Sequence, residues 1–161
     1  VELAASAPLE APNLYMPQTS FVGKPQWGHA ILGASLKDGK EAVPLTLNVE
    51  ENGKSSARTY TSGIGTGTRS VLSYLIPPNV DARFTAQVGL HADLGKEGSV
   101  TFEVLGNGRS LARLGPMRGD APSRSVDVAL AGVTNLQLTA TSAGGNGSGN
   151  YAVWAAPLLV K

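Results

Sequence analysis

The sequence contains no cysteine, so it cannot build the disulfide framework that holds many exported domains together. Only 16% of its 161 residues are charged, and 13 basic side chains against 12 acidic ones leave a net charge of +1. This balance provides no basic stripe of the kind that binds nucleic acid or an anionic membrane surface. We therefore expect neither of these as a partner.

Long apolar runs and the usual nucleophile motifs are missing as well. Residues 136–160 carry no charge, but the segment GGNGSGN interrupts them, so no membrane-spanning helix is expected. Residues 63–68, GIGTGT, lack the Lys-Ser/Thr pair of a phosphate-binding loop and precede a strand-like segment. With no cysteine, no Gly-x-Ser-x-Gly motif and no evident carboxylate pair, the sequence argues against a hydrolase mechanism.

Turn-forming residues are abundant, with 20 glycines and 10 prolines, which favours short strands over long helices. Apolar and polar residues alternate with period two in four segments, at 84–90, 100–104, 126–130 and 136–139. Weaker strands are expected at 30–36, 44–49, 57–62, 70–76, 109–114 and 151–160. One apolar and one polar face per strand predicts an all-β sandwich of two antiparallel sheets.

Among the turns, Asn107-Gly108 is the strongest hairpin signal, because both residues tolerate the positive φ of a type I′ turn. Further turns are predicted at Asp38-Gly39, Asn52-Gly53, Pro77-Pro78-Asn79 and Gly115-Pro116. Residues 1–13 are rich in Ala and Pro, and we interpret them as an N-terminal tether or arm, the remnant of a processed export segment. Residues 14–161 are then expected to form one extracytoplasmic domain that is secreted, periplasmic or at the cell surface.

Six short motifs follow one another in the order of a known family. They are Trp27-Gly28, Ser62-Gly63-Ile64-Gly65, the strand 84–89, the strand 98–104 (GSVTFEV), Gly106-Asn107-Gly108 and Ala152-Val153-Trp154-Ala155. Through these motifs, residues 27–158 resemble the NPCBM domain, a carbohydrate-binding module. The resemblance implies a jelly-roll β-sandwich of the galactose-binding-like type, with Gly-Ile-Gly as a turn. It also implies a non-catalytic function, the binding of a glycan or envelope polysaccharide.

Departures from the family pattern fall at polar positions. Thr66 and Gly67 follow Gly-Ile-Gly where the family has an apolar residue and a histidine, and LHAD at 90–93 replaces acidic residues. The closing loop reads NYAVW at 150–154 in place of Asp-His-Ala-Asp-Trp. Because scaffold residues are kept while polar ones differ, a structural subunit that docks to other cell-surface proteins is an alternative function.

Carbohydrate modules stack a sugar ring on an aromatic side chain and bind its hydroxyls with Asn, Asp, His or Arg. Residues of these types on expected loops make up the candidate glycan site: Trp27, Arg69, Asp93, Asn146, Asn150 and Tyr151. Asn146 and Asn150 lie in the glycine-rich loop, where asparagine also serves simply to form turns. Trp154 lies inside an apolar strand and is predicted to fill the core instead.

A metal site is the second alternative, built on the two histidines of the chain, His29 and His91. His91 follows a strand on the same side as Thr85 and Gln87, so its ring is expected to face solvent and to be free to coordinate. With Asp93 as a third ligand, this set suits copper or zinc, and redox chemistry is then the catalytic option. A structural calcium is the remaining cofactor option, and two unrelated surface histidines are the simpler interpretation.

Overall fold

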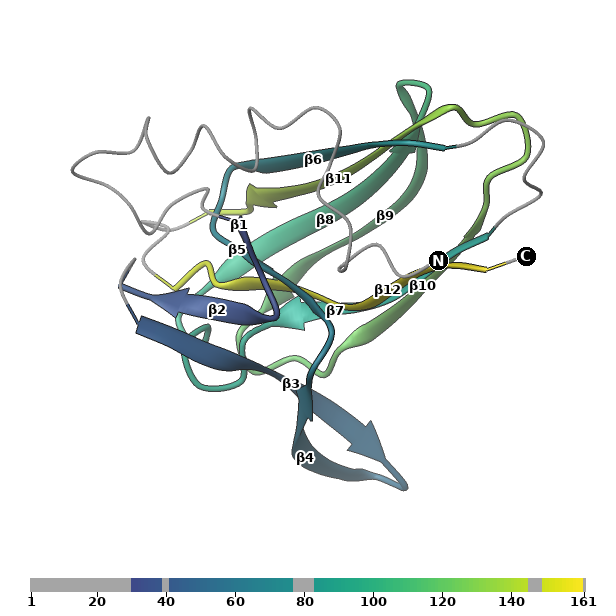
Figure 1. The fold of residues 1–161 in the computed structure, drawn as a ribbon. Coiled ribbons are helices and arrows are strands. Elements are labelled where there is room, and N and C mark those ends of the chain that lie inside the picture. Colours follow the sequence, from purple (N-terminus) through teal and green to yellow (C-terminus); the bar gives the residue numbers. More distant parts are fainter. Residues whose placement is uncertain (1–29, 39–40, 77–82, 145–148, 161) are drawn as a thin grey trace.

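The structure is a computed structural model, and it describes residues 30–38, 41–76, 83–144 and 149–160. These residues form an all-β sandwich in which every strand pairing is antiparallel (Figure 1). This confirms the predicted fold class. No described segment is a helix of the length and hydropathy that crossing a membrane requires. The expected arm at 1–13 and the expected start of the domain at residue 14 lie outside the described residues.

The described strands form three sheets. The five-stranded sheet has the order β1 (Ala30–Leu32), β5 (Gly63–Thr66), β12 (Ala152–Val160), β7 (Arg83–Leu90) and β10 (Arg124–Ala129). The four-stranded sheet has the order β6 (Ser70–Leu75), β11 (Asn135–Ser142), β8 (Ser99–Gly106) and β9 (Arg109–Arg118). The third sheet, which the sequence did not predict, has the order β2 (Ala34–Lys37), β3 (Glu41–Glu51) and β4 (Lys54–Tyr60).

The core lies between the two large sheets and follows the period-two pattern of the sequence. Phe84 and Val88 of β7 and Phe102 of β8 are fully buried there. Trp154 of β12 is also fully buried, with its ring edge-on to Phe102 at a centroid distance of 5.3 Å and an interplanar angle of 88°. Aromatic pairs favour this edge-to-face arrangement. The prediction that Trp154 fills the core is therefore confirmed.

The Asn107-Gly108 prediction is also confirmed, since these residues connect β8 to β9 with φ values of 51° and 82°. The Gly115-Pro116 prediction was wrong, because both residues lie inside β9. There the register shifts against β8, so β9 carries one residue more than its partner, as in a β-bulge. Gly115 sits at φ 135°, a conformation that side chains disfavour, which explains why a turn-like pair occurs inside a strand.

Gly63-Ile64-Gly65 was expected to form a turn, and this was wrong as well. These residues open β5, a strand hydrogen-bonded to β1 on one side and β12 on the other. A Cβ added to Gly65 would lie 2.2 Å from the carbonyl oxygen of Ala34 in β2. The glycine is needed for the close approach of β2 to β5 and not for a chain reversal.

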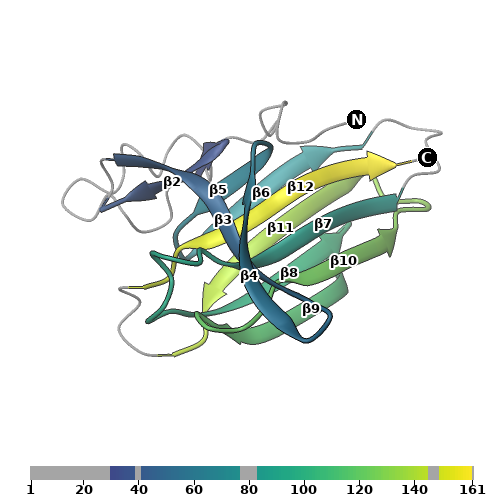
Figure 2. The same ribbon diagram turned by 90° about the horizontal axis from the view of Figure 1, so that it is seen from below.

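The third sheet lies on the outer face of the five-stranded sheet. Leu45 and Leu47 of β3 are fully buried against Val153 and Ala155 of β12, in a second, smaller core. The expected strand at 30–36 is divided at Gly33 into β1 and β2, so that the chain passes from the large sheet into the third one. Beyond this contact, the β3–β4 hairpin projects away from the sandwich, below it in Figure 1 and across its outer face in Figure 2.

Candidate functional site

Three connections lie together at one end of the sandwich, on the left in Figure 1, and Asn150 joins them. Its Nδ2 donates to Oγ1 of Thr68, in the β5–β6 connection, at 3.0 Å. Its Oδ1 accepts the backbone N–H of Ser99, at the start of β8, at 2.9 Å. Asn150 itself is 1% exposed. We refer to this part of the molecule as the loop end.

His91 lies at the same end, and the expectation that its ring faces solvent was wrong, since the residue is 0% exposed. Its Nδ1 accepts the backbone N–H groups of Asp93 and Leu94 at 3.1 and 3.2 Å. Its Nε2 therefore carries the proton and donates to the carbonyl oxygen of Pro44 at 2.8 Å. The prediction placed His91 on the outer side of the sheet that contains β7, and this was correct. Strand β3 covers that side, and its Leu47 forms an antiparallel backbone bridge with His91.

Tyr151 is 9% exposed, and its hydroxyl accepts the backbone N–H of Asp38 at 3.1 Å. Its carbonyl oxygen accepts the N–H of His91 at 2.8 Å, which brings the start of β12 against the end of β7. Together, His91, Asn150 and Tyr151 form a buried polar set that we call the frame. The side chains of the frame hydrogen-bond to neighbouring loops and thereby fix their positions.

Exposed polar side chains surround the frame. Arg69 follows Thr68, which Asn150 binds, and Asp93 follows His91 by two residues, so both candidates lie in connections that the frame holds. A hollow of about 450 Å³ opens at the same end. Its lining includes the charged side chains Lys96, Glu97, Arg118 and Asp120. We refer to these six exposed residues as the rim.

The hollow is built by close backbone approaches. A Cβ on Gly119 would fall 1.9 Å from the carbonyl oxygen of Gly95, and one on Gly98 would fall 2.1 Å from that of Gly149. The ion pairs within the described part of the chain, Arg58–Glu51 and Arg83–Asp127, involve no rim residue. Within that part, the rim therefore presents charged donors and acceptors that are available to a polar ligand.

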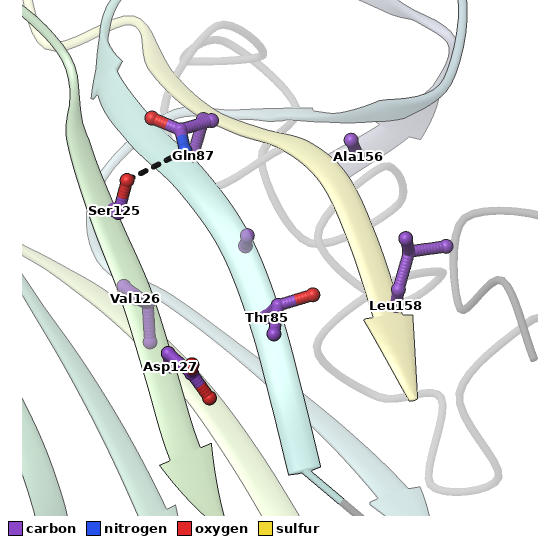
Figure 3. A pocket seen from close by; sticks show the side chains of 8 residues that line it. Thr85, Gln87, Ser125, Val126, Asp127, Ala156 and Leu158 are labelled. Carbon is purple, nitrogen blue, oxygen red and sulfur yellow. Dashed lines mark hydrogen bonds between the residues drawn. The ribbon is translucent and has the colours of Figure 1, made fainter. Parts of the chain in front are cut away.

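A second hollow, of about 330 Å³, lies on the outer face of the five-stranded sheet (Figure 3). Thr85 and Gln87 of β7 and Asp127 of β10 line it, with Leu158 of β12 on the opposite side. It opens where β12 shifts register between Ala155 and Leu158. On one side of it, Gln87 donates to Ser125 of the neighbouring strand β10 at 2.7 Å (Figure 3). Among the described residues, neither this hollow nor the one at the loop end is lined by an aromatic side chain. They differ in charge, since Lys96, Glu97, Arg118 and Asp120 line the loop-end hollow and Asp127 is the one charged residue in the lining of this one.

Three predicted site residues, Trp27, His29 and Asn146, lie outside the described residues. Of the others, the structure brings Arg69, Asp93, Asn150 and Tyr151 to the loop end. Lys96, Glu97, Arg118 and Asp120, which line the hollow, were not among the residues predicted from the sequence. For metal ligands, no group of three or more His, Cys, Asp or Glu side chains converges within the described ranges.

The family profile of the NPCBM/NEW2 domain matches residues 20–160. The chain belongs to this family. A curated relative of this NPCBM domain, from Renibacterium salmoninarum, is named as an endo-alpha-N-acetylgalactosaminidase and is 27% identical over 147 residues. That match takes in 89% of this chain but 9% of the relative, so the chain spans about a tenth of the relative's length.

Solved structures share the fold. The CBM51 module of a GH95 protein from Clostridium perfringens, in complex with methyl-galactose, superimposes with a TM-score of 0.77 at 24% identity, covering 100% of this chain and 99% of that one. The CBM51-2 module of ZmpB from the same organism, in complex with GlcNAc, gives a TM-score of 0.72 at 24% identity, over 82% and 27% of the two chains. Tandem CBM51 modules of a family 98 glycoside hydrolase from Streptococcus pneumoniae give 0.71 at 18% identity, over 83% and 41%.

Proposed function

We propose that this NPCBM domain is a non-catalytic carbohydrate-binding module that holds a larger, extracytoplasmic bacterial protein to glycans. The observation that carries the proposal is the combination of family membership with a loop end whose exposed polar groups surround a hollow. Two modules of the same fold are named in complex with methyl-galactose and with GlcNAc. We therefore propose hexoses of the galactose and N-acetylglucosamine type as the ligand class.

The proposed binding residues divide into two kinds. Arg69 and Asp93 present a guanidinium and a carboxylate that can bind sugar hydroxyls directly. Asn150 and Tyr151 are committed to loop contacts, so their contribution to binding is chiefly to hold Arg69 and Asp93 in place. Trp27 and Asn146, proposed from the sequence, supply the stacking aromatic and a further amide.

A glycan array probed with the whole chain tests the proposal, followed by calorimetric titration of the best ligand. We expect binding to glycans that end in galactose or N-acetylglucosamine. Trp27→Ala removes the stacking surface and should weaken binding by about 1–3 kcal/mol, the usual cost of truncating an anchor residue. Trp27→Phe, which keeps a ring, should retain most of the affinity.

The control is a circular dichroism spectrum and a melting temperature for each variant, because a loss of binding counts only in a folded protein. A wild type that binds no glycan on a broad array contradicts the proposed carbohydrate binding. A Trp27→Ala variant with unchanged affinity for its ligand contradicts the proposed stacking role of Trp27.

A further inference from the structure

The two strands of the β3–β4 hairpin differ in how the rest of the molecule holds them. Strand β3 is anchored on the sandwich, where the N–H of Ala92 donates to the carbonyl of Thr46 at 2.8 Å and that of Ser123 to the carbonyl of Asn48 at 2.7 Å. Strand β4 pairs with β3 and is the last strand of its sheet among the described strands. Its first six side chains are all exposed, and only Tyr60 is partly covered.

The turn fixes which backbone groups of β4 point outward. Asn52 and Gly53 have φ values of 54° and 75°, as in a two-residue type I′ turn, and Glu51 pairs with Lys54. In such a hairpin the flanking pair is hydrogen-bonded, and hydrogen-bonded and non-hydrogen-bonded pairs then alternate. The N–H and C=O groups of Ser55, Ala57 and Thr59 therefore face away from β3, along the free edge.

This edge lacks two of the features that usually block pairing with another strand, a proline and a β-bulge, and its two charged residues do not occupy the outward-facing positions. Strand β4 contains no proline, and its register with β3 shows no bulge. Its charged residues, Lys54 and Arg58, direct their backbone groups toward β3, and Arg58 forms an ion pair with Glu51. The outward-facing residues are the small Ser55, Ala57 and Thr59, which allow close approach of another backbone.

We propose that β4 pairs antiparallel with β4 of a second copy of this chain, with Ala57 on the two-fold axis. The outward-facing residues are placed symmetrically about Ala57, so Ser55 lies opposite Thr59 of the partner subunit and each pair exchanges backbone hydrogen bonds. In this register Arg58 lies opposite Ser56 of the partner subunit, and Lys54 lies opposite Tyr60 of the partner subunit. No like charges lie directly opposite one another. The diagonal neighbours of Arg58 are Lys54 and Arg58 of the partner subunit, and the ion pair of each Arg58 with Glu51 of its own chain offsets this repulsion.

This pairing joins the third sheets of two molecules into one continuous sheet. Two seven-residue strands bury less than the roughly 1,200 Å² of a standard stable interface, so the dimer is weak and depends on concentration. Its consequence is bivalency, because two loop ends on one particle bind a glycan surface with higher avidity than one. The dimer does not depend on sugar binding, and either property can fail without the other.

Sedimentation velocity over a concentration series, combined with amide hydrogen exchange, tests the interface. We expect reversible dimerisation, with the amides of Ser55, Ala57 and Thr59 at least tenfold slower to exchange at high than at low concentration. Ser56 and Arg58, which bond to β3, serve as internal controls and should be protected at both concentrations. A monomer up to millimolar concentration, or a dimer that leaves the outward amides unprotected, overturns the proposal.

Variants test the register. Ala57→Pro removes an outward N–H that β3 does not use and should abolish the dimer, whereas Ala57→Ser keeps that N–H and should leave it intact. Ser55→Lys with Thr59→Lys places like charges opposite one another, and Ser55→Glu with Thr59→Glu does the same. Each double variant should be monomeric, and an equimolar mixture of the two should form a heterodimer. A mixture that stays monomeric, or double variants that dimerise as the wild type does, rules out this register.

Discussion

The frame and the rim of the loop end both consist of polar residues, yet they stand in opposite environments. His91, Asn150 and Tyr151 are at most 9% exposed, and their side chains hydrogen-bond to neighbouring loops. The rim residues Arg69 and Asp93 are exposed and carry charges. A buried polar group left without its partner is costly, while an exposed one is solvated by water. Substitutions in the frame should therefore act on folding, and those in the rim on ligand binding.

The largest effects are expected in the frame. His91→Phe preserves an aromatic ring but leaves the N–H groups of Asp93 and Leu94 without an acceptor and removes one of the donors to the carbonyl of Pro44, which keeps Oγ1 of Thr46. We therefore expect a loss of about 3 kcal/mol in the free energy of unfolding. Asn150→Ala leaves the N–H of Ser99 without its acceptor and should cost about 2 kcal/mol. Urea unfolding monitored by tryptophan fluorescence, to which the buried Trp154 contributes, measures both values.

Matched replacements sharpen this result. His91→Gln and Asn150→Asp each keep an acceptor and should recover part of the lost stability. Ordinary surface substitutions change the free energy of unfolding by less than about 0.5 kcal/mol. If His91→Phe and Asn150→Ala each stay within this range, the claim that the frame stabilises the fold is wrong.

Smaller effects, of a different kind, are expected in the rim. Arg118→Ala and Asp120→Ala should leave the free energy of unfolding within about 0.5 kcal/mol of the wild type, because both side chains are exposed. Each should weaken binding of the sugar identified on the array by about fivefold, or roughly 1 kcal/mol, through loss of a hydrogen bond to the ligand. Titration calorimetry and urea unfolding on the same samples separate the two quantities.

Arg83→Ala serves as the control for the rim. This residue is also exposed and charged, but it pairs with Asp127 on the outer face of the sheet, far along β7 from the loop end. An exposed pair of this kind contributes about 0–1 kcal/mol to stability, and its removal should leave sugar affinity unchanged. If Arg83→Ala weakens binding as much as Arg118→Ala does, the sugar is not held at the loop end.

The sandwich could be predicted from the sequence because alternation reports directly on which side of a strand is buried. Phe84 and Phe102 lie on the apolar faces that alternation predicts, and Trp154 was assigned to the core because it lies inside an apolar strand; all three are fully buried. The third sheet could not be predicted, since alternation says which side a residue faces but not what covers that side. His91 is the clearest case, because its solvent side is covered by a strand more than 40 residues earlier in the chain.

The hollow at the loop end was missed for a related reason, although a signal for it exists. The Asn107-Gly108 turn makes β8 and β9 a hairpin, so the end of β9 lies beside the start of β8. Ser99 lies opposite Arg118 there. The register shifts twice on the way from the turn. Gly115-Pro116 marks the second shift but was interpreted as a turn, and no pattern of residue types marks the first. Extending the hairpin by symmetry would still have placed Arg118 and Asp120 beside Lys96 and Glu97, within about two residues.

An NMR titration of ¹⁵N-labelled protein with methyl-galactose and with GlcNAc tests the central claim, that this NPCBM domain binds sugar at the loop end. The account predicts that the largest shifts occur in the amides of Arg69, Asp93, Arg118 and Asp120 and their neighbours, with a common dissociation constant. The amide chemical shifts of Thr85, Gln87 and Ala57 should not change. Shifts concentrated on the outer sheet face or on β4, or no shifts with either sugar, would contradict it.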